Sequence, residues 1–299
     1  MAKSYSINEQ LGEDIMQPGT SLCVGCGADL AFRFLFRIID TKDLIIYGSP
    51  GCFLPEIWQT VATTTLSSLM TTVPSTMTGA SRYFRKVGRE ATLVAFVGDG
   101  CTADIGFQPL SAAAERGEQV IYVCYDNEAY QNTGIQRSGT TPYGAWSMTD
   151  QIGVKGSGKA QPAKYLPLIM AMHGIAYTAT LSIAHLDDFA QKVKKAKAAV
   201  KEGFVYLHIL APCPTGWRAR PEDCIEMARL AVDTNFFPLW EAERGTFRFT
   251  HLPKSISPIT EFTDLQGRFR HLTKQQLDEL QAIVNKKFAT ISALTRIEA

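Results

Sequence analysis

The sequence predicts an α/β fold, a doubly wound and mostly parallel β-sheet with helices on both faces. Short apolar runs alternate with longer helix-like stretches along the chain, which is the pattern of strand–helix–strand crossovers. The short runs are apolar or β-branched along their whole length rather than at every second residue. Strands of that kind are buried on both faces, as the strands of parallel sheets are.

Five strands and six helices are expected. The predicted strands are Leu44–Gly48, Thr92–Val97, Val120–Tyr125, Ile175–Thr180 and Val205–Leu210. The predicted helices are Ala28–Ile39, Gly106–Arg116, Tyr165–His173, Leu186–Lys201, Glu222–Val232 and Lys274–Ile297. The pattern loosens after about Pro214, so we expect a main α/β domain over residues 1–213 and a C-terminal extension over residues 214–299. A long Gly-, Ser-, Thr- and Pro-rich segment, residues 131–163, is expected to be functional.

The overall charge excludes two classes of partner. The 299 residues carry 30 Lys and Arg against 29 Asp and Glu, so the formal charge is +1. Neither nucleic acid nor an anionic membrane is an expected partner of such a chain. The polar N-terminus and the lack of an apolar run of about 18 residues predict a cytoplasmic protein. In a reducing compartment, an odd count of seven cysteines favours metal binding over disulfides.

A first candidate site lies where two neighbouring strands end. Gly98, Asp99 and Gly100 directly follow one strand, and Asn127 follows the next after 26 intervening residues. Ligands of doubly wound sheets collect at the carboxyl ends of the strands. Small residues there let backbone N–H groups approach phosphate oxygens, and carboxylate and amide oxygens suit Mg²⁺. The alternative is that Asp99 only caps the following helix.

A second candidate site is formed by cysteines. Cys23 and Cys26 make a C-x₂-C pair, Cys52 follows the first strand, and Cys213 follows the last. Four cysteines at one edge of a sheet suit either a structural zinc or an iron–sulfur cluster, and the spacing alone does not decide between them. The other three are expected outside this set: Cys124 as a core residue, and Cys101 and Cys224 as ordinary buried thiols.

Longer motifs carry a resemblance to a known family. The spacing from the GDG motif to Asn127 resembles the thiamine-diphosphate-binding motif. The segments SLCVGCGADLAFRF, GDGCTADIGFQPLSAAAERG, YDNEAYQNTGIQRSGTTPYGAW and AVDTNFFPLWEAERGTFR together resemble the β subunits of 2-oxoacid:ferredoxin oxidoreductases. The similarity runs from about Gly19 to Leu272.

The resemblance implies three cofactors and a role for each candidate residue. Thiamine diphosphate would lie on a sheet of the PP-domain type, with Asp99, the Asn127 side chain and the Ala129 carbonyl binding Mg²⁺. A [4Fe–4S] cluster would lie close to the thiamine, on ligands that include Cys52. Asn132 would face the aminopyrimidine as the catalytic candidate, with Thr133 beside it; the alternative for Asn132 is a turn-forming role. The full set of implied cluster ligands is Cys23, Cys26, Cys52 and Cys213.

The implied activity is the thiamine-dependent oxidative decarboxylation of a 2-oxoacid, with coenzyme A taking the acyl group and ferredoxin or NAD taking the electrons. Neither the activating glutamate nor ferredoxin-type cysteine runs are found in the sequence. The resemblance therefore implies an α subunit that supplies the pyrimidine-binding domain and the glutamate, together with γ and ferredoxin-like δ subunits. The C-terminal extension would pack against these partners. The alternatives are a non-redox thiamine-dependent decarboxylase and a zinc-stabilised, non-catalytic binding subunit.

The expected substrate is less narrowly defined. After Cys52 the chain departs from the pyruvate-type pattern and reads FLPEIW. Phe53, Leu54 and Trp58 would line space for a larger or aromatic oxoacid such as phenylglyoxylate, or they would simply pack between this loop and a partner subunit. Pyruvate and oxalate are the other substrates considered.

Overall fold

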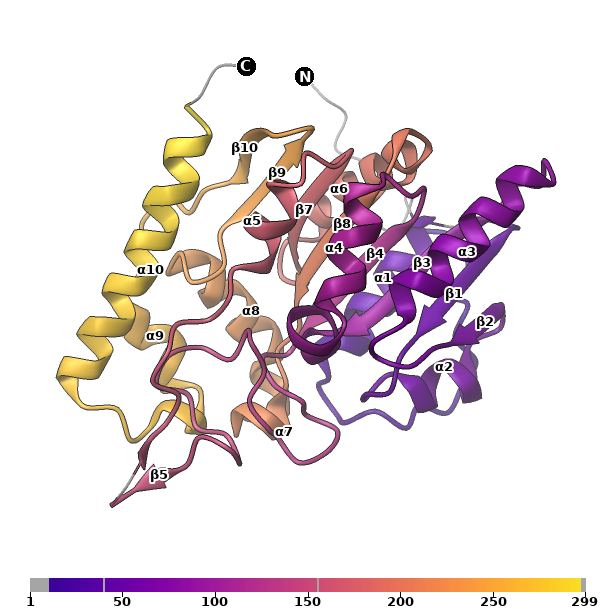
Figure 1. Cartoon of the computed structure of the whole chain (residues 1–299). Helices are drawn as coiled ribbons and strands as arrows, with labels where there is room; N and C mark the ends of the chain where they lie inside the picture. The colour runs from indigo at the N-terminus through magenta and orange to yellow at the C-terminus, as the bar shows by residue number, and fades with distance from the viewer. Residues whose placement is uncertain (1–10, 40, 155, 297–299) are drawn as a thin grey trace.

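A computed structural model describes residues 11–39, 41–154 and 156–296 and shows one large central sheet flanked by helices (Figure 1). The eight strands of the sheet have the order β10-β9-β7-β8-β4-β3-β1-β2. Their bounds are β1 Leu44–Gly48, β2 Thr64–Ser67, β3 Thr92–Gly98, β4 Ile121–Asp126, β7 Tyr177–Ser182, β8 Val205–Leu210, β9 Leu239–Glu243 and β10 Thr246–His251. A separate small hairpin pairs β5 (Ile152–Gly153) with β6 (Gly156–Ser157).

The six strands from β7 to β2 are parallel to one another, which confirms the predicted fold class. The five predicted strands match β1, β3, β4, β7 and β8, with shifts of at most two residues at their ends. In β4 and β8 every residue is buried, as expected of strands covered on both faces. Because parallel strands share one direction, their carboxyl ends all lie at one edge of the sheet.

Helices cover both faces of the sheet (Figure 1). The core cluster on one face includes residues of α1 and α6, and the core cluster on the other face includes residues of α3, α4 and α5. The bounds are α1 Gly27–Ile39, α2 Leu54–Thr60, α3 Val73–Lys86, α4 Phe107–Glu115, α5 Leu166–Ala171, α6 Leu186–Ala199, α7 Pro214–Trp217, α8 Cys224–Asp233, α9 Ile259–Asp264 and α10 Lys274–Leu294. The last residue of the helix predicted over Lys274–Ile297 lies outside the described residues.

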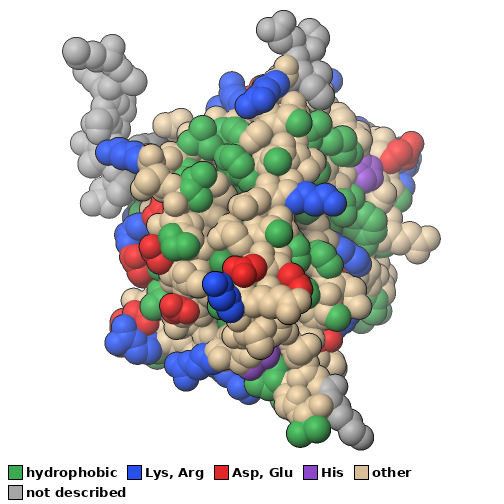
Figure 2. Space-filling view, turned by 90° about the vertical axis from the view of Figure 1, so that its left-hand side faces the viewer, with side chains coloured by type: hydrophobic (Ala, Val, Ile, Leu, Met, Phe, Trp, Pro, Cys, Tyr) green, Lys and Arg blue, Asp and Glu red, His purple; other side chains and the backbone are tan. Residues whose placement is uncertain are grey.

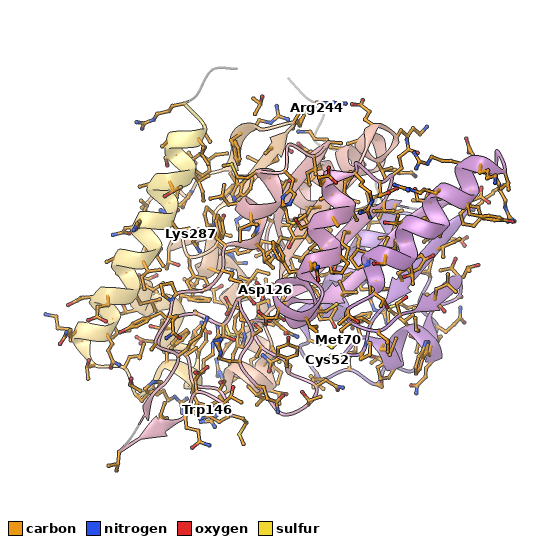
Figure 3. The ribbon with its side chains drawn as sticks, viewed as in Figure 1. Cys52, Met70, Asp126, Trp146, Arg244 and Lys287 are labelled. Carbon is orange, nitrogen blue, oxygen red and sulfur yellow. The ribbon has the colours of Figure 1, made fainter. Side chains whose placement is uncertain are left out.

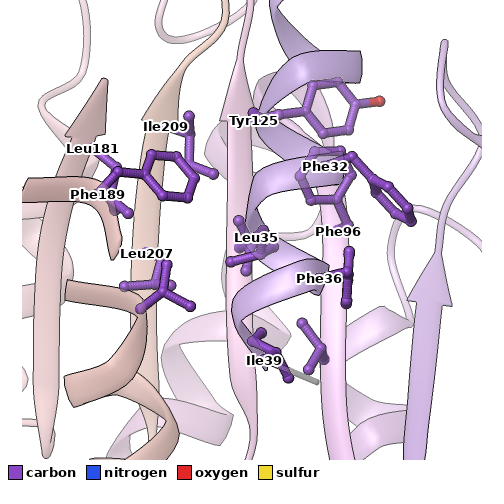
Figure 4. Close-up of a cluster of buried hydrophobic side chains, with 14 of the residues drawn as sticks. Phe32, Leu35, Phe36, Ile39, Phe96, Tyr125, Leu181, Phe189, Leu207 and Ile209 are labelled. Atoms are coloured by element: carbon purple, nitrogen blue, oxygen red, sulfur yellow. The ribbon is translucent and has the colours of Figure 1, made fainter. Parts of the chain in front are cut away.

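The packing between α1 and the sheet is dominated by aromatic rings (Figure 4). Phe32 of α1 lies edge-on to Phe96 of β3 with ring centroids 5.1 Å apart, and Phe96 stacks on Tyr125 of β4 at 4.8 Å. Aromatic pairs of this kind contribute about 0.5–1.5 kcal/mol beyond the burial of their area. They hold the ends of β3 and β4 in fixed relative positions, directly beneath the loops that follow these strands.

The sequence analysis missed β9 and β10, which lie in the stretch that appeared polar and irregular. They form an antiparallel hairpin whose first strand pairs with β7 and extends the main sheet. Charged side chains alternate along it: Arg248 forms ion pairs with Glu241 at 2.5 Å and with Glu243 at 2.8 Å. The charges made the segment look like a loop. Arg248 and Glu243 lie on the exposed side of the edge hairpin, whereas Glu241 is buried and its carboxylate is paired with Arg248 and Lys195.

The surface seen from the α10 side carries Lys and Arg as well as Asp and Glu, spread among apolar residues without a region of one sign (Figure 2). This agrees with the near-neutral formal charge of the chain. Among the described residues, no helix combines the length and the apolar character needed to cross a membrane.

Candidate functional site

The predicted site residues follow four strands that are neighbours in the sheet, in the order β8, β4, β3 and β1. Cys213 lies three residues after β8, Asn127 directly follows β4, Asp99 directly follows β3, and Cys52 lies four residues after β1. The Gly98↔Tyr125 register brings the ends of β3 and β4 level with each other. The carboxyl edge of the sheet therefore gathers both candidate sites into one place.

Asp99 is almost fully buried, with 1% of its surface exposed. It accepts hydrogen bonds from the hydroxyls of Ser138 and Thr140, the latter at 2.9 Å. Burial, and then the nearby Asp126 carboxylate, raise the pKa of Asp99 well above its usual range. A buried carboxylate with a raised pKa is a frequent feature of functional sites, and a cation in contact with it would favour its charged form.

The three groups expected to bind Mg²⁺ meet in the structure. One end of the Asn127 side-chain amide lies 2.9 Å from Asp99 Oδ1 and 3.0 Å from the Ala129 carbonyl oxygen. In the absence of a cation, the amide nitrogen is the end that donates to both oxygens. With the amide oxygen in that position instead, three oxygens would converge and would need a cation between them.

A cavity of about 130 Å³ adjoins these groups. Every predicted thiamine-binding residue lines it, together with Met70 and Tyr130, which the sequence analysis did not identify. Figure 3 shows Cys52 and Met70 close together, with Asp126 nearer the middle of the molecule. The predicted residues on the cavity wall are Cys52, Gly98, Asp99, Gly100, Asn127, Ala129, Asn132 and Thr133.

The rim of the cavity is formed by the loop after β4. Asn132 and Thr133 are exposed there, whereas Asp99 and Asn127 lie buried at the base. Tyr130 donates a hydrogen bond to the Gly100 carbonyl at 2.9 Å, and a Cβ at Gly100 would overlap the Tyr130 ring. Gly100 is therefore needed for this close approach. It also precedes a short π-helix, Cys101–Ile105, an irregularity that is common at functional sites.

The four cysteines of the second candidate site lie close enough to affect one another electrostatically. Burial and, to a smaller extent, the nearby Cys213, Cys26 and Cys23 thiolates together raise the pKa of Cys52 to about 12. Burial also raises the pKa of Cys26 to about 12, with a contribution from Cys213. The Thr215 hydroxyl, two residues after Cys213, lies 3.6 Å from the Cys23 sulfur. The C-x₂-C loop, the loop after β1 and the loop after β8 thus converge.

Local backbone contacts hold these cysteine loops together. The Gly27 N–H donates to the Pro212 carbonyl at 3.0 Å, and a Cβ at Gly27 would overlap Pro212. The Cys213 sulfur accepts the Gly216 N–H at 3.3 Å, at the start of α7. Backbone N–H donors of this kind stabilise a thiolate and tune an iron–sulfur cluster.

The other three cysteines are all buried. Cys124 and Cys224 are buried in hydrophobic core clusters. Cys101 is buried and lines the cavity wall, where its thiol donates to the Met70 carbonyl at 3.1 Å. Among the residues that the structure describes, no set of three or more His, Cys, Asp or Glu side chains is arranged to hold a single metal ion.

The expectation that Phe53, Leu54 and Trp58 line the substrate space is not supported. None of the three is part of the cavity wall. Phe53 is 1% exposed and stacks on Phe32 with ring centroids 4.7 Å apart, so it belongs to the core beneath α1. Leu54 is buried as well, whereas Trp58 is 63% exposed on α2. Phe53 and Leu54 are thus buried within this chain, which neither the substrate expectation nor the expected packing against a partner subunit described.

Comparisons with known proteins agree with this geometry. A family model described as the thiamine pyrophosphate enzyme C-terminal TPP-binding domain matches residues 54–209. Pyruvate synthase subunit PorB of Methanothermobacter marburgensis is 43% identical, and the alignment covers 91% of this chain and 96% of that protein. The chain belongs to the β subunits of the 2-oxoacid:ferredoxin oxidoreductases. It is an oxidoreductase subunit with a thiamine-diphosphate-binding domain, as predicted.

Other members of this family have different substrates in their names. Ketoisovalerate oxidoreductase subunit VorB of Pyrococcus furiosus is 37% identical over 95% of this chain and 94% of its own length. NADH-dependent phenylglyoxylate dehydrogenase subunit beta of Aromatoleum evansii is 41% identical over 92% of this chain, which spans 64% of that longer protein. A 2-oxoglutarate:ferredoxin oxidoreductase of Magnetococcus marinus shares the fold, with a TM-score of 0.57 and 20% identity over 76% of this chain and 81% of its own.

Proposed function

We propose that this β subunit holds thiamine diphosphate, Mg²⁺ and one [4Fe–4S] cluster at the carboxyl edge of its sheet, and that the assembled enzyme oxidatively decarboxylates a 2-oxoacid. The observation that carries the proposal is the position of Cys52. It lines the cavity with Asp99 and Asn127, and its pKa responds to the other three cysteines. One residue thus adjoins both proposed cofactor sites, so the path for electrons from one to the other would be short.

The proposed Mg²⁺ site is supported by the distances from the Asn127 amide to the other two ligands. In an octahedral site with Mg–O bonds of about 2.1 Å, neighbouring ligand oxygens lie about 3.0 Å apart. The Asn127 amide lies 2.9 Å from Asp99 Oδ1 and 3.0 Å from the Ala129 oxygen. The groups are therefore already spaced for a small, hard cation. The diphosphate oxygens would complete its coordination, next to the small residues Gly98 and Gly100.

The proposed ligands of the cluster are the four converging cysteines. A single tetrahedral zinc with Zn–S bonds of about 2.3 Å would need sulfurs about 3.8 Å apart. No such group of side chains occurs among the described residues, although the four cysteines affect one another's pKa values. A four-iron cluster holds its thiolates further apart, because each sulfur binds a different iron. This favours a cluster over zinc on Cys23, Cys26, Cys52 and Cys213.

Thiamine diphosphate supplies the carbanion chemistry and the electron sink for decarboxylation when it is bound. The role of this chain is to anchor and orient. Asp99 and Asn127 would hold the diphosphate end through Mg²⁺, and Asn132 at the rim would face the aminopyrimidine next to Thr133. Met70 and Tyr130, which also line the cavity, would help to exclude water from it.

The active site is completed by partner subunits in this proposal. Asp99 is the only carboxylate among the residues that line the described cavity, and it is occupied by the Mg²⁺ role. The activating glutamate would come from an α subunit with the pyrimidine-binding domain. Electrons would leave through a ferredoxin-like δ subunit to ferredoxin or NAD, and a γ subunit would complete the complex. Coenzyme A would accept the acyl group.

Turnover by the intact complex tests this proposal. Purified with its partners, the complex is assayed for acyl-CoA formation and acceptor reduction with pyruvate, ketoisovalerate, 2-oxoglutarate, phenylglyoxylate and oxalate. We expect one or more of these oxoacids to deliver two electrons to the acceptor for each acyl-CoA formed, which corresponds to two reduced ferredoxins or one NADH. Release of an aldehyde without any reduction of the acceptor would instead support a non-redox decarboxylase and would rule out the proposal.

A further inference from the structure

A buried ion pair connects the loop after β4 with the C-terminal part of the chain. Arg268 donates to the Glu128 carboxylate at 2.5 Å, and the exposed fractions of the two side chains are 3% and 5%. Placing both charges away from water costs several kcal/mol per ion, and their attraction does not always repay this cost. Burial of this pair is therefore weak evidence that it stabilises the fold, and a functional role is the alternative.

Glu128 holds the backbone between two proposed Mg²⁺ ligands. Its φ angle is +62°, in the left-handed region that residues other than glycine seldom adopt. The Glu128 N–H donates to Asp126 at 2.9 Å, and the Glu128 carbonyl accepts the Thr141 hydroxyl at 2.6 Å. Such a strained conformation persists only where the surroundings enforce it. The Arg268 ion pair provides that restraint from the side chain, and so it fixes where Asn127 and Ala129 point.

The same arginine contacts the residue that joins this loop to the cysteine site. The Arg268 guanidinium lies over the Trp217 ring, 4.0 Å from its centroid. The Trp217 indole N–H donates to the Asn127 carbonyl at 2.9 Å, and the Trp217 backbone N–H donates to the Cys213 carbonyl at 2.8 Å. Trp217 is 0% exposed, so its ring has no freedom to move independently.

Arg268 itself is held rigidly. Its Nε donates to Gln266 Oε1 at 2.9 Å, and its carbonyl accepts the Trp146 N–H at 3.0 Å. Its contact with the Trp217 ring also brings its charge close to the cysteine site, because Trp217 is hydrogen-bonded to the Cys213 carbonyl. The guanidinium therefore contacts one site through Glu128 and lies near the other through Trp217.

We propose that Arg268 is a positioning residue that couples the two cofactor sites, fixing the Asn127–Ala129 loop through Glu128 and the Cys213 loop through Trp217. The inference rests on the function proposed above. It predicts that Arg268 sets the affinity for Mg²⁺ on one side and the reduction potential of the cluster on the other. A buried cation next to a cluster favours its reduced, more negative state, and so it raises the potential.

The test compares variants of the intact complex with two readouts that do not depend on turnover. Arg268→Met keeps most of the side-chain length and removes the charge, whereas Glu128→Gln keeps the shape and leaves Arg268 unpaired. Lys192→Met is the matched control, because Lys192 is another buried cation, paired with Asp188 at 2.6 Å and bonded to Thr180 rather than to the cofactor loops. Mg²⁺ affinity is measured in the presence of thiamine diphosphate, and cluster potentials are measured by EPR-monitored titration.

We expect Arg268→Met to weaken Mg²⁺ binding about 10- to 100-fold, as the loss of a group that orients a metal ligand does. The same variant should lower the potential of the cluster, and Glu128→Gln should raise it. Lys192→Met should change neither. Opposite shifts in potential cannot arise from a general loss of stability. If Arg268→Met fails to assemble, the Mg²⁺ affinity and the cluster potential of Glu128→Gln alone decide whether the ion pair acts on both sites.

Two outcomes overturn the inference. One is unchanged Mg²⁺ affinity and potential in both variants together with lowered thermal stability, which would make the pair purely structural. The other is an effect on one site without the other, which would remove the coupling. Failure of the underlying proposal would be seen separately in two controls. A wild-type complex that contains no thiamine would show that thiamine is not bound here, and a cluster signal that persists in Cys23→Ser would show that the cluster is not bound here.

Discussion

Replacing Asp99 by asparagine should leave the cofactor-free protein nearly as stable as the wild type while removing its response to Mg²⁺. The Thr140 hydroxyl lies 2.9 Å from Asp99 and 2.8 Å from Asp126, so the two carboxylates lie within about 6 Å of each other. Two like charges at about that distance repel by about 3 kcal/mol at an effective dielectric constant of about 20. The substitution removes this repulsion.

The substitution also weakens the two hydrogen bonds that Ser138 and Thr140 donate to Asp99, because an amide oxygen accepts less strongly than a carboxylate. Each loss costs about 1 kcal/mol. The removed repulsion and the weakened hydrogen bonds nearly cancel, so the free energy of unfolding of cofactor-free Asp99→Asn lies within about 1 kcal/mol of the wild-type value. Binding is different: at 100 times its dissociation constant, a ligand stabilises the native state by about 2.7 kcal/mol, which corresponds to about 100-fold slower local opening.

Hydrogen–deuterium exchange of the intact complex measures both effects in the segment 126–141. In the wild type, Mg²⁺ and thiamine diphosphate together should slow exchange there about 100-fold, whereas in Asp99→Asn they should have no effect. The matched control is Asp104→Asn, since Asp104 contacts the same loop through the Gly139 N–H at 2.8 Å without being a proposed ligand. Full protection and full thiamine content in Asp99→Asn would refute the proposed role of Asp99.

Two further predictions concern the cysteines and a buried lysine. Cys213→Ser should lose iron from the purified complex, whereas Cys224→Ser should not; equal losses would show that Cys213 is not a ligand. Burial lowers the pKa of Lys192 from 10.5 to about 8. Between pH 8 and 10.5 the unfolded chain therefore binds one proton that the folded chain has lost, so the free energy of unfolding rises with pH in this range. Relative to Lys192→Met, the wild type should gain up to about 3 kcal/mol from pH 8 to 10.5 in denaturant unfolding; a flat difference would contradict this.

The parallel part of the fold was predictable because its strands are short, fully apolar runs. Leu44–Gly48 and Val205–Leu210 were predicted with their correct bounds, and both are strands with a neighbour on each side and little solvent contact. The edge hairpin β9–β10 was not predictable in the same way. Its charged residues pair with one another, including the buried Glu241, so its composition resembles that of a loop until the pairing partners are known.

The candidate site was predictable where a residue directly follows a strand. Asp99 and Asn127 fall under that rule, and the structure brings them within 2.9 Å of each other. Thr140 and Arg268 had no such signal, because they reach the site from distant loops and are placed only by tertiary packing. Met70 was missed for the same reason: an apolar side chain gives no indication in the sequence of which cavity it lines.

The iron content of the complex tests the central claim most directly. The claim is that this chain carries a [4Fe–4S] cluster next to the thiamine site, so the double variant Cys23→Ser/Cys26→Ser should remove two of its four ligands. Compared with the wild-type complex, the variant should contain four fewer iron atoms per copy of this chain, with thiamine and partner subunits retained. An unchanged iron content would contradict the account, because the clusters would then lie entirely on other subunits.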